Sequence, residues 1–298
     1  MQGSSQNILI SPKQAAKALG VSESSLKRWC DNGKINVTRT PGGHRKMSVA
    51  DLFDFVRKND VTLVSPELLG LPPVVGKKAD DITRLRNELT DSLLSGDELK
   101  AQGLVFDLLL NKLPLHKLFD DIITPAMYEI GRRWECNEAE IYQERMGCQI
   151  SLRLLHQIRR LIPLPNEQTT AEKNIAIGGT LSGDRYTIAT AMVELILRNR
   201  GIHATSIGAS IPGVSFVNAI RKMQPKLVWI STTYIENHHQ FLSEFRLISK
   251  FCIDRGILLV IGGNVFVPEL RKQISFNFFG DTMKHLDTFA KLSCHPTC

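Results

Sequence analysis

The chain has 298 residues, of which 43% are hydrophobic and 22% charged, and its formal net charge is +7. This length accommodates two or three domains with cores of their own, and the composition is that of an ordinary soluble protein. No run approaches the roughly 18 uninterrupted apolar residues of a membrane span, and the first residues lack the pattern of a signal peptide. We therefore expect a cytoplasmic protein with no membrane partner.

Most of the positive charge lies in one segment. Residues 1–58 hold ten Lys and Arg against four Asp and Glu, which places +6 of the net charge of +7 there. A local excess of this kind is typical of a module that binds a polyanion.

This basic segment has the helix start and stop signals of a helix-turn-helix. Ser11 followed by Pro12 predicts the start of a helix that ends at Gly20. Ser22 predicts the start of a second helix, which ends at Gly33. In a helix-turn-helix the second helix enters the major groove of DNA.

The next residues predict a wing. The run "TRTPGGHRKMS", residues 38–48, reads as two short strands joined by a turn at Pro41-Gly42-Gly43. A third helix from Val49 to Lys58 would close the small core.

Together, these residues resemble the winged-helix DNA-binding domain of MerR-type transcriptional regulators. A short helix pair alone could instead be a protein-docking module, but that alternative explains neither the wing nor the charge excess. The resemblance implies that double-stranded operator DNA is contacted by Ser24, Ser25, Lys27 and Arg28 of the second helix and by Arg39, His44, Arg45 and Lys46 of the wing.

The rest of the chain divides by its periodicity. Residues 61–80, rich in Pro and Gly, predict a linker. Residues 81–165 have apolar residues at three- and four-residue steps, which predicts four helices in a compact bundle. The domains are therefore expected at residues 1–60, 81–165 and 172–298.

From residue 172 onward, short apolar runs alternate with helical stretches at 186–200, 212–223, 238–255, 267–274 and 282–292. This rhythm predicts a flavodoxin-like, doubly wound parallel sheet whose ligands lie at the carboxyl ends of the strands. The expected fold class is thus multidomain, α followed by α/β.

A four-helix bundle directly before such a sheet resembles the cobalamin-binding module of methionine synthase and corrinoid proteins. Joined to a MerR-type domain, it resembles, over nearly the whole chain, the cobalamin-dependent, light-sensing MerR-type regulators of bacterial carotenoid genes. The resemblance implies homodimers or tetramers. It also implies a cofactor site formed by Trp134, Glu144, Arg145, Asp184, Tyr186, Ser231, Gly262 and Gly263.

The chain differs from this family at the two positions whose histidines ligate cobalt. The family's Asp-x-His-x-x-Gly signature, in which the histidine ligates cobalt and the glycine leaves room for the nucleotide tail, reads here Asp184, Tyr186 and Ala189. Arg145 stands where the light-sensing relatives have a second histidine. Neither a neutral phenol nor a guanidinium is a good cobalt ligand. We therefore expect no histidine-ligated cobalamin, and any bound cobalamin would be held without an axial side chain.

Cysteine usage predicts no separate metal site. Cys294, His295 and Cys298 form a loose terminal group without a second pair of ligands, and the six cysteines are expected to be reduced thiols.

The domain order predicts a DNA-binding transcriptional regulator and not an enzyme, with no catalytic residues and with a C-terminal sensor or oligomerisation domain. Another small molecule or a regulatory protein partner would then supply the signal. Two alternatives stay open: a true cobalamin-dependent, light-responsive repressor, and a corrinoid carrier or methyltransferase component.

Overall fold

The computed structural model describes residues 9–59, 61–72, 81–162 and 174–294. It divides into two compact units, Met1–Pro163 and Leu164–Cys298. Residues 73–80 of the predicted linker, as well as His295 and Cys298 of the terminal group, lie outside the described residues. Among the helices described, none has the length and apolarity needed to span a bilayer.

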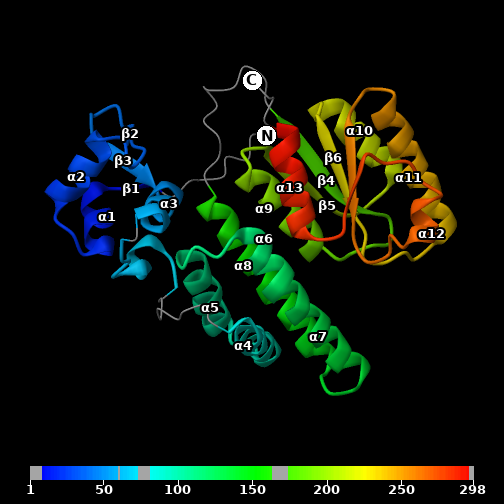
Figure 1. Cartoon of the computed structure of the whole chain (residues 1–298), viewed down its shortest axis with the longest axis horizontal. Helices are drawn as coiled ribbons and strands as arrows, with labels where there is room; N and C mark the ends of the chain where they lie inside the picture. The colour runs from blue at the N-terminus through cyan, green and yellow to red at the C-terminus, as the bar shows by residue number, and fades with distance from the viewer. Residues whose placement is uncertain (1–8, 60, 73–80, 163–173, 295–298) are drawn as a thin grey trace. The chain divides into compact units, whose positions relative to one another are not determined.

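The first unit opens with a winged helix-turn-helix (Figure 1). Its elements are β1 (Leu9–Ile10), α1 (Pro12–Leu19), α2 (Glu23–Asp31), β2 (Thr38–Arg39), β3 (Arg45–Ser48) and α3 (Val49–Asn59). The Ser11 side chain accepts from the backbone N of Gln14 while the Gln14 side chain accepts from the Ser11 N, and Gly20 ends α1 at φ 63°. The sequence does not predict β1, because a two-residue strand shows no alternation; it pairs antiparallel with β3.

The helical part of this unit follows. Its elements are η1 (Pro66–Leu69), α4 (Ile82–Ser95), α5 (Glu98–Leu110), α6 (Leu115–Lys117), the π-helical segment η2 (Leu118–Ile123), α7 (Thr124–Glu135) and α8 (Ile141–Leu161). Leu85, Leu89 and Leu93 form the fully buried stripe of α4, which contacts α5, α7 and α8. The predicted bundle is confirmed, with a third helix that includes a π-helical segment not predicted from the sequence.

The π-helical segment has a local cause and a specific partner. Pro125, in the first turn of α7, has no N–H, so the carbonyl of Asp121 lacks its ordinary helical donor. The guanidinium of Arg86 on α4 donates to that carbonyl from Nε at 3.2 Å and from Nη2 at 3.0 Å. Arg86 therefore replaces the missing backbone hydrogen bond and fastens α4 to the interrupted helix.

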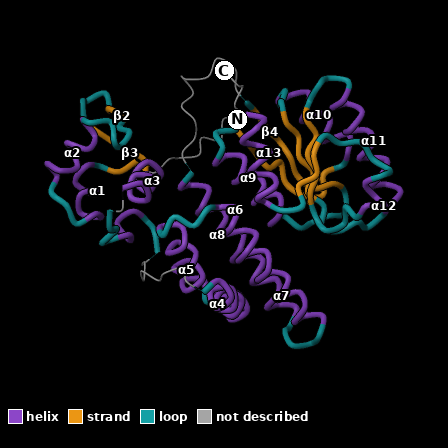
Figure 2. Tube along the Cα trace, in the orientation of Figure 1, coloured by secondary structure: helices purple, strands orange, loops and turns teal. Residues whose placement is uncertain are grey.

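The second unit is the predicted doubly wound sheet (Figure 2). Its elements are β4 (Ile175–Leu181), α9 (Ile188–Asn199), β5 (His203–Ile211), α10 (Gly213–Met223), β6 (Leu227–Ser231), α11 (His238–Ile253), β7 (Leu258–Gly262), α12 (Pro268–Arg271), β8 (Phe278–Gly280) and α13 (Met283–Cys294). The five strands are parallel, in the order β5-β4-β6-β7-β8. Helices α9 and α13 cover one face and α10 and α11 the other (Figure 1).

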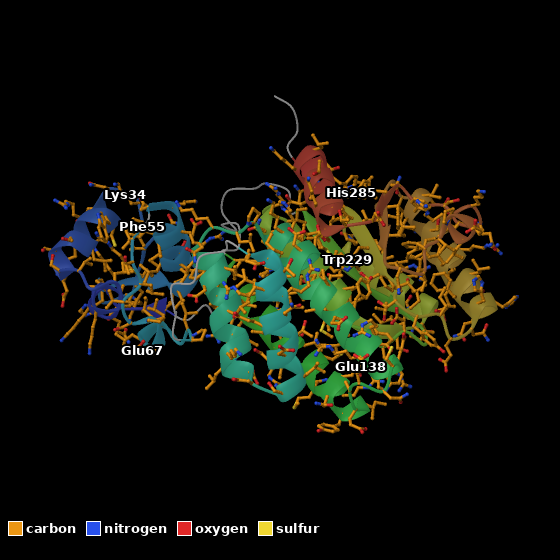
Figure 3. The ribbon with its side chains drawn as sticks, turned by 60° about the horizontal axis from the view of Figure 1, so that its bottom comes forward. Lys34, Phe55, Glu67, Glu138, Trp229 and His285 are labelled. Carbon is orange, nitrogen blue, oxygen red and sulfur yellow. The ribbon has the colours of Figure 1, made fainter. Side chains whose placement is uncertain are left out.

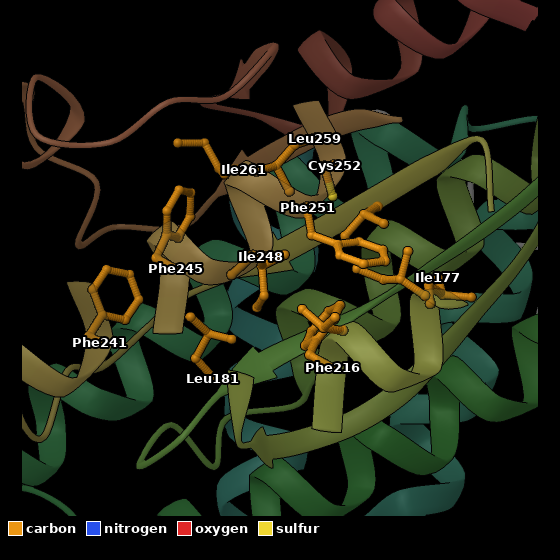
Figure 4. Packing of buried hydrophobic residues seen from close by; sticks show 14 of the residues in the cluster. Ile177, Leu181, Phe216, Phe241, Phe245, Ile248, Phe251, Cys252, Leu259 and Ile261 are labelled. Atoms are coloured by element: carbon orange, nitrogen blue, oxygen red, sulfur yellow. The ribbon is translucent and has the colours of Figure 1, made fainter. Parts of the chain in front are cut away.

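Strand periodicity decides which side chains enter each layer. Val228 and Ile230 of β6 lie in the cluster under α10 and α11, where Phe216 and Phe245 are also fully buried (Figure 4). The alternate residue Trp229 points to the opposite layer, where its indole N–H reaches α9. The switch in strand order lies between β4 and β6, so the loops after these strands border the crevice at which this fold class binds ligands.

Replacing Arg86 by Met should lower the free energy of unfolding by about 1 kcal/mol or more, because the Asp121 carbonyl then loses the two N–H donors that Arg86 supplies. Urea unfolding of the full chain, followed by far-UV circular dichroism, measures the loss. Arg84→Met is the matched control, since Arg84 is exposed and pairs only across one helical turn with Glu88. Equal losses in the two variants would contradict the role of Arg86.

Candidate functional site

The N-terminal turn of α2 is ordered by three serines. Ser22 caps the helix by accepting from the backbone N of Ser25 at 3.1 Å. The hydroxyls of Ser24 and Ser25, both predicted DNA contacts, lie 2.8 and 3.0 Å from the Ser22 Oγ. Their first task is thus to fix the start of α2.

The outer and inner sides of α2 are sharply divided. Leu26 and Cys30 are buried, and the Trp29 ring lies 4.9 Å from that of Phe55 on α3 (Phe55 is labelled in Figure 3). Lys27 and Arg28 are exposed on the other side. The apolar residues of α2 therefore hold the helix so that its cations face solvent.

The wing is a short, hydrogen-bonded hairpin. Thr40 N donates to the carbonyl of His44 at 2.9 Å, and Gly43 N donates to that of Thr40 at 2.8 Å. Gly43 has φ 78°, a conformation that glycine adopts without strain. His44, which follows this turn, and Arg39 of β2 are both exposed.

Arg45 has a partner that the sequence did not reveal. Its Nη2 lies 2.7 Å from Oδ1 of Asp31, the last residue of α2. The guanidinium therefore joins the wing to α2 and is less available to DNA than its predicted role required. Lys27 has a looser contact of 3.9 Å with Glu23, and Lys46 is half-buried.

In the second unit, Asp184 binds loops together at the carboxyl ends of the strands. Its carboxylate accepts from the backbone N of Tyr186 at 3.0 Å on Oδ1 and from those of Thr233 at 2.7 Å and Tyr234 at 3.4 Å on Oδ2. Its own carbonyl accepts from the backbone N of Ser210, in the irregularly paired last part of β5. One side chain, 1% exposed, thus connects the loops after β4 and β6.

Burial raises the pKa of Asp184, while the N–H groups of Thr233, Tyr186 and Tyr234 act in the lowering direction. Both carboxylate oxygens are occupied by backbone donors of the same unit. In the family signature, the aspartate at this position stands two residues before the histidine that ligates cobalt. Tyr186, at the position of that ligand, has a side chain that is 41% exposed.

The glycine pair after β7 has a structural explanation. Gly263 has φ 124°, and a Cβ there would lie 2.0 Å from the carbonyl oxygen of Thr232. A Cβ on Gly262 would meet the carbonyl oxygen of Gly280 at 3.0 Å. The close backbone approach therefore requires glycine at 263, and the tight contact with Gly280 favours it at 262. Ser231, at the end of β6, is buried.

The predicted cofactor residues of the bundle belong to the first unit. Trp134, near the end of α7, is 45% exposed. Glu144, in the first turn of α8, is paired with the Nε of Arg145 at 3.2 Å and accepts from Sγ of Cys148 at 3.3 Å. Burial, together with the nearby Glu144 charge, raises the pKa of Cys148 to about 12, so this thiol stays protonated. Within the described residues, no group of three or more His, Cys, Asp or Glu side chains could hold a metal ion.

Comparisons with known proteins agree with both halves of this arrangement. A family model described as a helix-turn-helix domain matches residues 9–60, and one described as a B12 binding domain matches residues 85–158, within α4 to α8. Over 267 residues the chain is 24% identical to the HTH-type transcriptional repressor CarH of Myxococcus xanthus, a match that covers 84% of this chain and 87% of CarH. The chain is CarH-like.

Two corrinoid proteins of Methanosarcina barkeri are also similar. The dimethylamine corrinoid protein is 19% identical over 179 residues, covering 60% of this chain and 83% of that protein. The solved structure of the monomethylamine corrinoid protein matches with a TM-score of 0.58 at 14% identity, covering 72% of this chain and 100% of that chain. This likeness shows a shared fold, the helical bundle followed by the parallel sheet.

Asp184→Asn should destabilise the CarH-like chain by about 1–3 kcal/mol, because its amide NH₂ would face a backbone N–H at whichever oxygen position it takes. The measurement is urea unfolding at neutral pH. Asp281→Asn, at an exposed position after β8, makes the same chemical change without these donors and should be neutral. A more stable Asp184→Asn variant would instead mean that the cost of the buried charge exceeds the value of its hydrogen bonds.

Proposed function

We propose that the CarH-like chain is a transcriptional regulator that reads operator DNA with α2 and the wing. The observation that supports this best is the row of exposed cations, Lys27, Arg28 and Arg39 together with His44, on a winged helix that also carries most of the net charge. In this proposal Ser24 and Ser25 order the helix end at the phosphate backbone, Lys46 supports the wing, and Arg45 sets the angle between wing and helix through Asp31.

The α/β unit, in this proposal, works without histidine-ligated cobalamin. Tyr186 and Arg145 stand at the two histidine positions, and the Asp184 carboxylate is already occupied by backbone amides. The unit would act as a sensor for another signal, or as an oligomerisation domain that pairs two or four copies on an operator. Trp134, Glu144, Ser231, Gly262 and Gly263 then serve the structure of their own units.

Control would follow from a shift between DNA-competent and incompetent assemblies. A small effector, a regulatory protein or the concentration of the chain itself can drive this shift only through a difference in affinity for the two forms. We propose no catalytic step for any of these residues. The alternative that keeps cobalamin and light is favoured by the similarity to CarH and is decided by reconstitution.

Arg28→Ala should weaken operator binding by about 1–3 kcal/mol if the guanidinium reads a base edge. Electrophoretic mobility shift with the operator region, at two salt concentrations, measures the loss. Lys272→Ala removes the same charge from an exposed position in the other unit and should leave binding unchanged. Equal affinities of the two variants would exclude Arg28 from the DNA surface.

Reconstitution tests the sensor half. The full chain is incubated with adenosylcobalamin in the dark, desalted, and examined by visible absorption spectroscopy. We expect a colourless protein, because neither histidine position offers cobalt a ligand. A protein that retains the corrin spectrum, and whose DNA affinity changes on illumination, would support the light-responsive alternative.

A further inference from the structure

One large side chain, that of Trp229, lies in the layer between the sheet and α9. Trp229 of β6 is 1% exposed and lies opposite Gly178 in the register of β6 with β4 (Trp229 is labelled in Figure 3). A Cβ built on Gly178 would lie 2.0 Å from Cδ2 of the indole and 2.3 Å from Cγ and Cε2. The ring thus lies directly over the backbone of β4, in space that every residue except glycine would need for its own side chain.

The indole is fixed at its other end by α9. Its Nε1 donates to the Thr190 Oγ1 at 2.8 Å, and Thr190, in the first turn of α9, is itself 1% exposed. The Ser206 hydroxyl of β5 lies 3.4 Å from the same oxygen. Buried indole N–H groups ordinarily find such a partner, and this one prevents the ring from swinging out of the layer without leaving a polar atom unpaired.

The position of this ring bears on the proposed sensor. Ala189 directly precedes Thr190, and the resemblance to corrinoid modules places the passage of a nucleotide tail beside residue 189. A flat, bicyclic ligand ring inserted beside residue 189 would enter a layer that the indole of Trp229 already occupies. Protein interiors are packed too densely to hold both without large movement.

We infer that Trp229 is a specificity-determining residue. Its indole occupies the layer between β4, β6 and α9, and it acts as an internal plug that excludes any ligand whose ring would have to bind in that layer. This inference deepens the proposed function, on which it rests for the location of the ligand. It confines the unit to ligands that bind at the rim of the sheet, near Tyr186 and Tyr234, both of which are exposed.

Removing the Trp229 indole tests the inference directly. Trp229→Ala should create an apolar cavity of indole size with one hydrogen-bond acceptor, and millimolar indole or benzimidazole should raise the Tm of this variant by a few degrees. Neither compound should shift the wild type. Trp134→Ala, the same substitution at an exposed site, should also show no shift. A Trp229→Ala variant that folds but gains no stability from either ring would overturn the inference.

Two further measurements serve if that variant does not fold. Gly178→Ala should be strongly destabilised in the wild type and tolerated in a Trp229→Leu background, and an equal loss in both backgrounds would contradict the contact. In the variant Trp29→Phe/Trp134→Phe, Trp229 is the remaining tryptophan, and its emission should be shielded from acrylamide with or without adenosylcobalamin. Exposure of Trp229 on adding the corrinoid would overturn the plug.

These results separate the inference from the proposed function. A wild type that binds cobalamin while Trp229 stays shielded would contradict the cobalamin-free sensor and leave the plug intact. If the wild type stays colourless but Trp229→Ala binds neither indole nor benzimidazole, the plug is contradicted. The cobalamin-free sensor is then still supported.

Discussion

The hydrogen bonds of the Asp184 carboxylate are the interaction that holds the loops at the carboxyl ends of the strands in the α/β unit. Parallel strands end here in backbone amides that no ladder satisfies, and a buried amide without an acceptor costs about 1–3 kcal/mol. Asp184 accepts from Tyr186, Thr233 and Tyr234, so the loops after β4 and β6 are held at one point. Asp184 therefore fixes the two loops that border the switch in strand order.

These structural roles also change how the Gly-Asp turn and the later glycine pair are interpreted. A Gly-Asp turn followed by a helix and a later glycine pair has the outline of a cofactor site, yet each residue has a sufficient reason within the sheet. Asp184 holds loops, and Gly263 allows the close approach of the Thr232 carbonyl. Residues with such tasks would be needed whether or not a ligand binds, so their presence is weak support for a cofactor.

How far the sequence predicts this molecule depends on the range of each interaction. The ends of α1 at Ser11 and Gly20, and the strand of which Trp229 is part, follow from local caps and from apolar runs, and the structure confirms them. The bond between Arg86 and the Asp121 carbonyl, the Asp31 partner of Arg45 and the Gly178–Trp229 contact join residues that are 35, 14 and 51 positions apart. No local pattern marks such pairs, although a glycine in a buried strand signals a close approach.

The filled layer under α9 constrains how the regulator could respond to a signal. A ligand shifts an equilibrium only by its difference in affinity for the two states. Around Trp229 the interior is occupied and the indole N–H is satisfied by Thr190, so a ligand gains little by entering. In the proposed function, the free energy that shifts the chain between assemblies would therefore come from its surfaces: the exposed rim at Tyr186 and Tyr234, or contacts with another copy or a protein partner. Such a switch would respond to concentration and to competing macromolecules, and it would couple to the occupation of an operator by several winged helices.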